Sequence, residues 1–349
     1  MIILGIETSC DETAVSVVKI EHGNFKIFSN IISSQVKVHA KYGGVVPEVA
    51  ARLHIKIILP LVERSLKEAR LNWKKIDYIA VCSGPGLMSS LLVGIETAKT
   101  LAYVFKKPLI KINHLEGHLF SGQNKVKEWK LPIIGLVVSG GHTQIYLIKD
   151  YLKYKLVGGT IDDAAGEAFD KVAKILGLGY PGGPAISNYV AKSKISKLKK
   201  HQPIILPRPM IKSNDLQMSF SGLKTAVLYA WRDGQLKFKG IELEKARLSL
   251  ATDFQQAVID VLVKKTLKAA EKYNAKIVVL GGGVSANFEL RKQLGEAIAH
   301  NGNVKFVAPE LKMTGDNAAM IAKAAYYHVK KKDFVEPFKL TADANWELR

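Results

Sequence analysis

Two histidines four residues apart are the clearest indication of chemistry in this chain. His114 and His118 lie in the segment HLEGH, which contains no proline. On a helix, residues four apart project from one face, so both imidazoles could reach a single metal ion. Asp316 precedes a predicted helix over residues 318–329, where a carboxylate either caps the helix or completes a metal site. The residues alone leave both roles open.

A glycine-containing turn follows the histidine pair. The apolar run 132–138 predicts a buried strand that ends at Ser139, Gly140 and Gly141, and residues 143–146 predict a returning strand. Backbone amides at the tip of such a hairpin can approach phosphate oxygens closely, because glycine adds no side chain there. A possible metal pair beside a phosphate-binding hairpin indicates chemistry on a nucleotide.

The same pattern of strand, polar tip and strand occurs at the N-terminus, in residues 2–18. Two such hairpins predict an internally duplicated α/β protein that closes on a nucleotide between its halves. The tip of the first hairpin carries Glu7, Asp11 and Glu12. These carboxylates could bind a metal, attract a substrate ammonium group or act as a general base. A solvated acidic turn is the alternative interpretation.

Three other segments contain residues that could contact a ligand. Asp170 lies on the polar face of a helix predicted over residues 162–176, where it is either a site residue or a solvated charge. The turn YPGGP at 180–184 has a backbone that could lie against a flat ring or a ribose. The GGG turn at 281–283 leads to Asn287, whose amide could contact a sugar hydroxyl or a base.

The composition is typical of a globular, intracellular protein. A length of 349 residues favours two domains, and a hydrophobic content of 48% is ordinary. Cys10 and Cys82 are the only cysteines, too few for a disulfide framework, which suits a reducing compartment. No apolar stretch reaches the roughly 20 residues of a membrane span. We therefore expect a soluble, cytoplasmic protein without disulfides.

The formal charge of +20 favours a polyanionic partner, and nucleic acid is the obvious one. However, only 8 of the 51 basic residues are arginine, which is the better fork for phosphate. The lysine-rich segments 192–201 and 330–332 could contact RNA or could be solvated helix faces. Charge alone therefore leaves RNA binding open.

Nine segments, in order, extend through nearly the whole chain. They are GIETSCDETA (5–14), YGGVVPEVAAR (42–52), HLEGH (114–118), VSGGHTQ (138–144), DDAAGEAFDK (162–171), YPGGP (180–184), FSGLKTA (220–226), GGGVSAN (281–287) and GDNAAMIA (315–322). Together they resemble the signature blocks of the TsaD (Gcp) family, the bacterial tRNA N6-adenosine threonylcarbamoyltransferases.

This resemblance implies a two-lobed, duplicated α/β fold similar to the actin, Hsp70 and sugar-kinase (ASKHA) superfamily, with a nucleotide cleft between the lobes. We expect an N-terminal lobe of residues 1–110 and 330–349, and a C-terminal lobe of residues 111–329 that carries the metal and nucleotide site. The implied reaction transfers threonylcarbamoyl from threonylcarbamoyl-AMP to the exocyclic amine of the adenosine 3′ of the tRNA anticodon.

The resemblance also assigns roles to individual residues. It implies that one divalent metal ion, most often iron and sometimes zinc, is held by His114, His118 and Asp316. The residues implied to bind the threonylcarbamoyl-adenylate are Val137, Val138, Ser139, Gly140, Gly141, Asp170, Gly183 and Asn287. Asp170 would reach a ribose hydroxyl, and Asp11 and Glu12 would lie beside the reacting carbonyl. The implied partners are tRNA, a TsaB-like paralogue and a TsaE-like ATPase.

Two other enzyme classes fit parts of the sequence. A metalloprotease of the zincin type needs the pattern H-E-x-x-H, whereas here Glu116 stands one place late, on another helix face. A sugar kinase or ATPase would share the fold, but Glu7 replaces the usual aspartate of its first phosphate motif. A non-catalytic scaffold would not need three metal ligands. The transferase is therefore the favoured prediction.

Overall fold

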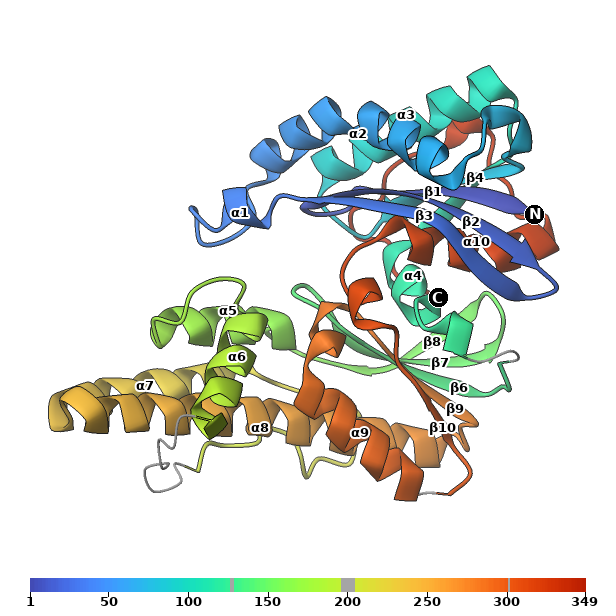
Figure 1. Cartoon of the computed structure of the whole chain (residues 1–349). Coiled ribbons are helices and arrows are strands. Elements are labelled where there is room, and N and C mark those ends of the chain that lie inside the picture. Colours follow the sequence, from blue (N-terminus) through green and yellow to red (C-terminus); the bar gives the residue numbers. More distant parts are fainter. Residues whose placement is uncertain (126–128, 196–204, 301) are drawn as a thin grey trace. The chain divides into compact units, whose positions relative to one another are not determined.

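The structure is a computed structural model that describes residues 1–125, 129–195, 205–300 and 302–349. Its residues group into two compact units, each containing most of one five-stranded sheet. The first unit comprises Met1–Lys130, Ile148–Lys155 and Val307–Arg349, and the second comprises Leu131–Leu147 and Leu156–Phe306. Each unit is described separately below, with the element labels of Figure 1.

Apolar, β-branched runs form the sheet of the first unit. Its strands are β1 (Ile2–Glu7), β2 (Glu12–Glu21), β3 (Asn24–Ser34), β4 (Tyr78–Gly84) and β5 (Leu109–Asn113), in the order β3-β2-β1-β4-β5. β1 pairs antiparallel with β2 and parallel with β4, and β4 pairs parallel with β5. The side chains of β1 and β4 are almost all buried, as in central strands that are covered on both faces.

Helices cover both faces of this sheet (Figure 1). α2 (Pro47–Ala69) and α3 (Met88–Phe105) lie on one face, and α10 (Ala318–Lys331) lies on the other. The short helix α4 (His114–Phe120) follows β5 directly and packs against α10. The remaining elements are α1 (Val36–His39) and the 3-10 helices Trp73–Lys75, Gln123–Lys125, Leu311–Met313 and Pro337–Lys339. The sequence predicted that Pro60 would kink or split its helix; α2 is not split there.

Gly5 lets α10 lie close against β1. A β-carbon at this position would collide with the carbonyl oxygen of Ala318 and would come within 3.1 Å of the Cβ of Ala322. Only a hydrogen atom fits in this space. Because Asp316 lies just before α10, the close approach also fixes the distance of that carboxylate from β1.

Two buried polar contacts join α4 to α10. The carboxylate of Glu116 lies 3.1 Å from Nε2 of His328, and Nδ1 of the same ring lies 2.8 Å from Asp333. Lys323, which is 1% exposed, donates a hydrogen bond to the carbonyl oxygen of Ser121, just after α4. Buried charges are costly unless they are paired, so these contacts hold the two helices in one arrangement.

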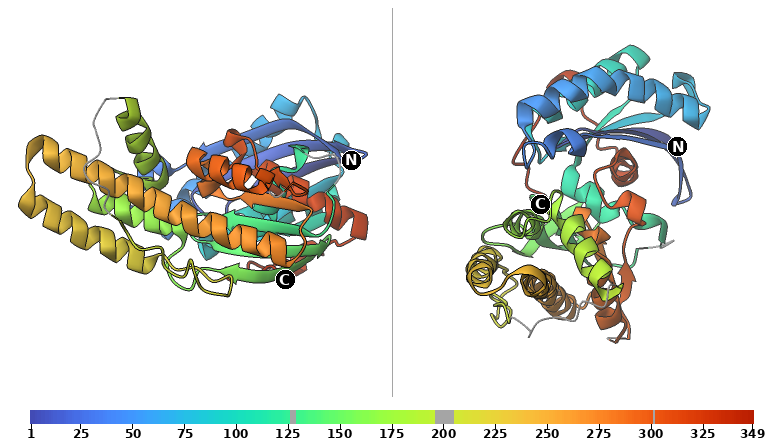
Figure 2. Two further views of the ribbon diagram at one scale, coloured as in Figure 1. Left: turned by 90° about the horizontal axis from the view of Figure 1, so that it is seen from below. Right: turned by 60° about the vertical axis from the view of Figure 1, so that its left-hand side comes forward.

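The second sheet has the order β10-β9-β6-β7-β8. Its strands are β6 (Ile133–Val138), β7 (Thr143–Asp150), β8 (Lys153–Gly159), β9 (Ile277–Gly281) and β10 (Lys305–Val307). The helices of this unit are α5 (Ala165–Ile175), α6 (Gly182–Ile195), α7 (Ser221–Lys237), α8 (Gly240–Lys272) and α9 (Phe288–His300), with a 3-10 turn at Gly283–Ala286. α7 and α8 lie side by side as a long helical pair (Figure 2).

The two sheets repeat one strand order. In sequence order each consists of a three-stranded meander followed by two strands on the other side of its first strand. β6 pairs parallel with β9, just as β1 pairs parallel with β4. The predicted α/β class and the repeated hairpin are therefore confirmed, while the nucleotide cleft stays a prediction.

The boundaries of the two units differ from the lobe boundaries expected from the sequence. The expected N-terminal lobe ended at residue 110 and resumed at 330, whereas the first unit extends to Lys130 and resumes at Val307. The difference arises because α4 and α10 pack against the first sheet. His114, His118 and Asp316 therefore all belong to the first unit, not to a C-terminal lobe.

Two features predicted from composition can be located in part. Most of the lysine-rich segment 192–201 lies outside the described residues, whereas Lys330, Lys331 and Lys332 are exposed at the end of α10. Cys10 and Cys82 are free thiols. Among the described residues, no helix has the length and apolar character needed to cross a lipid bilayer.

We expect Gly5→Ala to lower the free energy of unfolding by about 2 kcal/mol, because the added methyl group forces α10 away from β1. Urea denaturation of the full chain measures this. Gly44→Ala is the control, since a β-carbon there meets no atom within 4 Å. Equal stability of the two variants would contradict the packing argument.

The ion pair at His328 predicts a pH dependence. Burial lowers the pKa of His328, but Glu116 and Asp333 outweigh this effect and raise it from 6.5 to about 9. The pair therefore stabilises the fold fully below pH 6.5 and loses this contribution as the pH rises through about 9. We expect the difference in unfolding free energy between the wild-type chain and His328→Gln to shrink between about pH 6 and about pH 10. A difference that does not change with pH would rule out an ionised pair; exposed His300→Gln is the control.

Candidate functional site

The histidine pair lies on a short helix at the carboxyl end of β5. Asn113 ends the strand, and its side chain accepts a hydrogen bond from the amide of Leu115 at 2.9 Å, which starts α4. His114 and His118 are one turn apart and both buried. Their ring centroids lie 4.6 Å apart, so the predicted shared face is confirmed.

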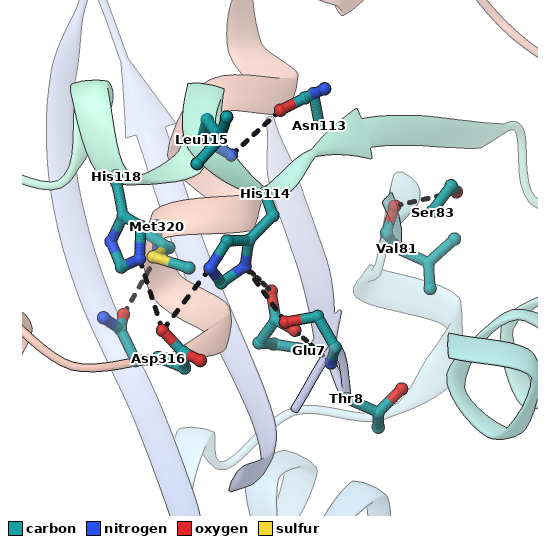
Figure 3. Close-up of polar contacts among 12 residues, drawn as sticks. Glu7, Thr8, Val81, Ser83, Asn113, His114, Leu115, His118, Asp316 and Met320 are labelled. Carbon is teal, nitrogen blue, oxygen red and sulfur yellow. Dashed lines mark hydrogen bonds and ion pairs between the residues drawn. The ribbon is translucent and has the colours of Figure 1, made fainter. Parts of the chain in front are cut away.

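Asp316 faces both rings and does not cap α10 (Figure 3). The cap is Asn317, whose side-chain oxygen accepts from the amide of Met320 at 3.1 Å. The carboxylate of Asp316 lies 3.6 Å from Nε2 of His114 and 3.2 Å from Nε2 of His118. Of the two roles left open by the sequence, capping therefore does not belong to Asp316, because the neighbouring asparagine supplies the capping oxygen.

The geometry of these three side chains fits a metal ion. Ligand atoms held at about 2.1 Å from a tetrahedral ion lie about 3.4 Å from one another, close to both measured distances. The ring nitrogens of His118 are buried, and within the described residues neither has a hydrogen bond of good geometry. Nε2 lies 3.2 Å from the Asp316 carboxylate, and a cation bound to both atoms would satisfy this nitrogen. The three residues thus form a possible metal site.

The charges around the rings differ. Burial lowers the pKa of His118, which keeps its ring neutral, as metal ligation requires. Burial also opposes charge on His114, but Asp316 and Glu7 together raise its pKa to about 9.

A second group of possible ligands, Glu7, Cys82 and His114, shares the His114 ring. Cys82 was not singled out from the sequence, since a lone cysteine at the end of a buried strand carries no recognisable signal.

The acidic tip of the first hairpin is not a solvated turn. Asp11 is buried, and Glu12 accepts a hydrogen bond from Ser34 at 2.9 Å. Burial, reinforced by the carboxylates of Asp316 and Asp11, raises the pKa of Glu12 to about 9. The same causes raise the pKa of the Cys10 thiol. Glu12 therefore lies within electrostatic reach of Asp316, one of the three possible ligands.

The predicted phosphate-binding hairpin is the turn between β6 and β7. Val137 and Val138 are fully buried, so only their backbone is available to a ligand. The amide of Ser139 donates to the carbonyl of His142 at 2.8 Å, which closes the turn, and the tip residues Gly140 and Gly141 are exposed. The exposed, side-chain-free tip is what the sequence predicted.

Asp170 lies on α5 against the YPGGP turn. Its carboxylate accepts a hydrogen bond from the amide of Gly182 at 2.6 Å, and burial raises its pKa. No atom lies within 4 Å of the position that a β-carbon at Gly183 would occupy. The structure therefore brings Asp170 and this turn together, and Asp170 is partly buried rather than a solvated charge.

Asn287 has three neighbours that the sequence did not reveal. Its oxygen accepts from the amide of Leu290, at the start of α9, while its amide nitrogen donates to Ser187 at 3.0 Å and to Gln255 at 2.9 Å. Both amide hydrogens are thus engaged within the second unit, and the oxygen retains one lone pair. Ser187 and Gln255 lie within helices, where local pattern gives no sign of such a contact.

Comparison with known proteins agrees with these observations. The sequence model of the TsaD family, described as tRNA N6-adenosine threonylcarbamoyltransferase, matches residues 26–323. A protein of that name from Syntrophomonas wolfei is 46% identical over 98% of this chain and 96% of its own length. Another, from Persephonella marina, is 48% identical over 95% of this chain and 91% of its own length.

Solved structures support the fold alone. The structural match to HypF from T. kodakarensis includes 97% of this chain and 49% of the HypF chain, at 13% identity and a TM-score of 0.61. A full-length HypF in a phosphate- and nucleotide-bound form gives a TM-score of 0.58 at 14% identity. From the family model and the near full-length relatives together, it follows that the chain belongs to the TsaD family of tRNA N6-adenosine threonylcarbamoyltransferases.

Proposed function

We propose that this chain transfers the threonylcarbamoyl group of threonylcarbamoyl-AMP to the exocyclic amine of the adenosine 3′ of the anticodon in tRNA. Family membership over nearly the whole chain carries this proposal. The two-histidine, one-carboxylate arrangement in the first unit adds a site suited to oxygen-rich substrates, because three protein ligands leave coordination positions open.

His114, His118 and Asp316 would hold one divalent ion, iron or zinc. When bound, the ion would supply Lewis acidity toward carboxylate or carbamate oxygens of the threonylcarbamoyl group. Nitrogen and carboxylate ligands suit both metals, and neither is preferred by the ligand set itself. The remaining chemistry falls to the residues of the chain.

The hairpin amides of Ser139–Gly141 would hold phosphate or carbamate oxygens of the adenylate, with Val137 and Val138 contributing only backbone. Asp170 would accept a hydrogen bond from a ribose hydroxyl. Gly183 has open space beside it, and Asn287 keeps one lone pair of its oxygen for the substrate. Because the adenylate is already activated, positioning and charge stabilisation are the main requirements.

In the transfer, the exocyclic amine forms a bond to the carbamoyl carbon while the bond to the AMP oxygen breaks, and the amine loses one proton. Asp11 or Glu12 would orient the amine or accept that proton. With a pKa of about 9, Glu12 is mostly protonated at neutral pH. Neutralisation of Asp316 by a bound cation would remove one cause of this raised pKa and favour the ionised form of Glu12, which can accept a proton.

We further propose a cytoplasmic location, with tRNA, a TsaB-like paralogue and a TsaE-like ATPase as partners. Exposed apolar side chains on two adjacent helices support a protein partner for the first unit. Ile55 and Leu59 of α2 are 65% and 56% exposed, and Leu92 of α3 is 42% exposed. Apolar side chains that gather on adjacent helices favour association with another chain.

The metalloprotease alternative fits the structure less well. Glu116, the glutamate between the two histidines, hydrogen-bonds with Tyr154 at 2.6 Å and pairs with His328. It is therefore engaged away from the ligand face. The ASKHA-type ATPase or kinase alternative shares the fold, and ATP turnover distinguishes it from the transferase.

The decisive experiment supplies purified chain, partner subunits, unmodified tRNA and adenylate labelled in its threonylcarbamoyl group. Label incorporated into tRNA, and lost on chelation, supports the reaction and its metal dependence together. No incorporation with every partner present, combined with ATP turnover or sugar phosphorylation, would favour the kinase-like alternative.

We expect His118→Ala to lower the transfer rate at least about 100-fold, because the ion loses a ligand and the Lewis acidity that it supplies. Bound metal, counted by elemental analysis, should fall in parallel. His300→Ala removes an exposed histidine and serves as the control. Full metal content and activity in folded His118→Ala would exclude this residue as a ligand.

We expect Asp170→Asn to raise the KM for the adenylate about 10-fold with little change in kcat, because a charge-assisted hydrogen bond to the ribose would be lost in both ground and transition states. The neutral side chain can still accept from the Gly182 amide, so the turn should persist. Asp233→Asn, on the exposed face of α7, is the control. An unchanged KM would remove Asp170 from the substrate site.

A further inference from the structure

Glu7 is a fully buried carboxylate at the end of β1. It contacts His114 on the side of the ring opposite Asp316 (Figure 3). Its two oxygens have different partners. Oε1 accepts a hydrogen bond from the amide of Ser9 at 2.5 Å, and Oε2 lies 3.2 Å from Nδ1 of His114. The hydroxyl of Ser9 also lies 3.1 Å from Nδ1.

These contacts limit where the ring carries its proton. An ionised carboxylate can only accept hydrogen bonds, so the contact with Glu7 requires hydrogen on Nδ1. The other nitrogen, Nε2, faces Asp316. A neutral ring with its hydrogen on Nδ1 presents a lone pair at Nε2, on the side where His118 and Asp316 converge.

We propose that Glu7 is a positioning residue that fixes the Nδ1–H tautomer of His114 and so leaves Nε2 free to bind the metal ion. This inference rests on the proposed metal site but goes beyond it, because Glu7 supplies no ligand to that site. Carboxylates that orient a ligating imidazole generally strengthen metal binding about 10- to 100-fold. Glu7 is well suited to this role because its orientation is itself held by the backbone amide of Ser9.

The Glu7→Gln variant tests the tautomer directly. A backbone N–H can only donate, so the Ser9 amide selects the oxygen of the new side chain and turns its NH2 group toward His114. Nδ1 must then accept, and the ring proton moves to Nε2, where it competes with the metal. The Ser9 hydroxyl could still accept from Nδ1, so the double variant Glu7→Gln/Ser9→Ala removes that alternative.

We expect zinc to bind about 10- to 100-fold more weakly to Glu7→Gln than to the wild-type chain. The double variant should bind zinc no more tightly than Glu7→Gln does. Competition with a chromogenic chelator measures this without tRNA or adenylate. Ser65→Ala, which removes another buried hydrogen bond of the first unit, is the control and should bind zinc as the wild-type chain does. Wild-type affinity in both folded Glu7 variants would overturn the inference.

Nitrogen-15 NMR of histidine-labelled protein provides a second readout, with His114 assigned from the spectrum of His114→Asn. We expect Nδ1–H in the zinc-loaded wild-type chain, and also in the metal-free chain at alkaline pH, where the ring is neutral. Metal-free Glu7→Gln should show Nε2–H, and Nδ1–H in the double variant would overturn the inference.

Failure of the proposed metal site and failure of the inference about Glu7 give different results. A wild-type chain that binds no zinc removes the proposed metal site, while the tautomer of the metal-free chain still tests Glu7. If Glu7→Gln does not fold, Glu7→Asp keeps the charge but shortens the reach by one methylene. Weaker zinc binding by Glu7→Asp supports the inference, and wild-type affinity contradicts it.

Discussion

The close contact between α10 and β1 is the constraint on which the geometry of the proposed metal site depends. Gly5 admits the first turn of α10, and Asp316 lies immediately before that turn. Two residues beyond Gly5, the same strand ends at Glu7. One contact therefore sets the position of a carboxylate on each side of His114. Protein interiors are close-packed, so a shift of α10 would change the distances of both carboxylates from His114 together.

The sequence predicted those site features that follow from local periodicity. Histidines four apart on a short helix, and a glycine turn between two apolar runs, depend on spacing alone, and both occur as predicted. Asp316 could not be assigned from sequence, because aspartate and asparagine serve equally as helix caps, and here the asparagine beside it does so.

Other features depend on contacts between segments far apart in the chain. The expected lobe boundaries failed because the packing of α4 and α10 on the first sheet has no local signature. For the same reason the partners of Asn287 and the contact between Glu7 and His114 were not foreseen. The burial of Asp11 likewise reflects neighbouring elements, although its sequence context is that of a solvated turn.

The first unit is discontinuous: the whole of the second unit is inserted before its last segment. Protein synthesis proceeds from the N-terminus, so His114 and His118 emerge long before Asp316. A nascent chain therefore offers the proposed site only two of its three ligands, on a helix that still lacks α10 as its support. The complete set of the three proposed ligands is thereby postponed until translation is nearly finished.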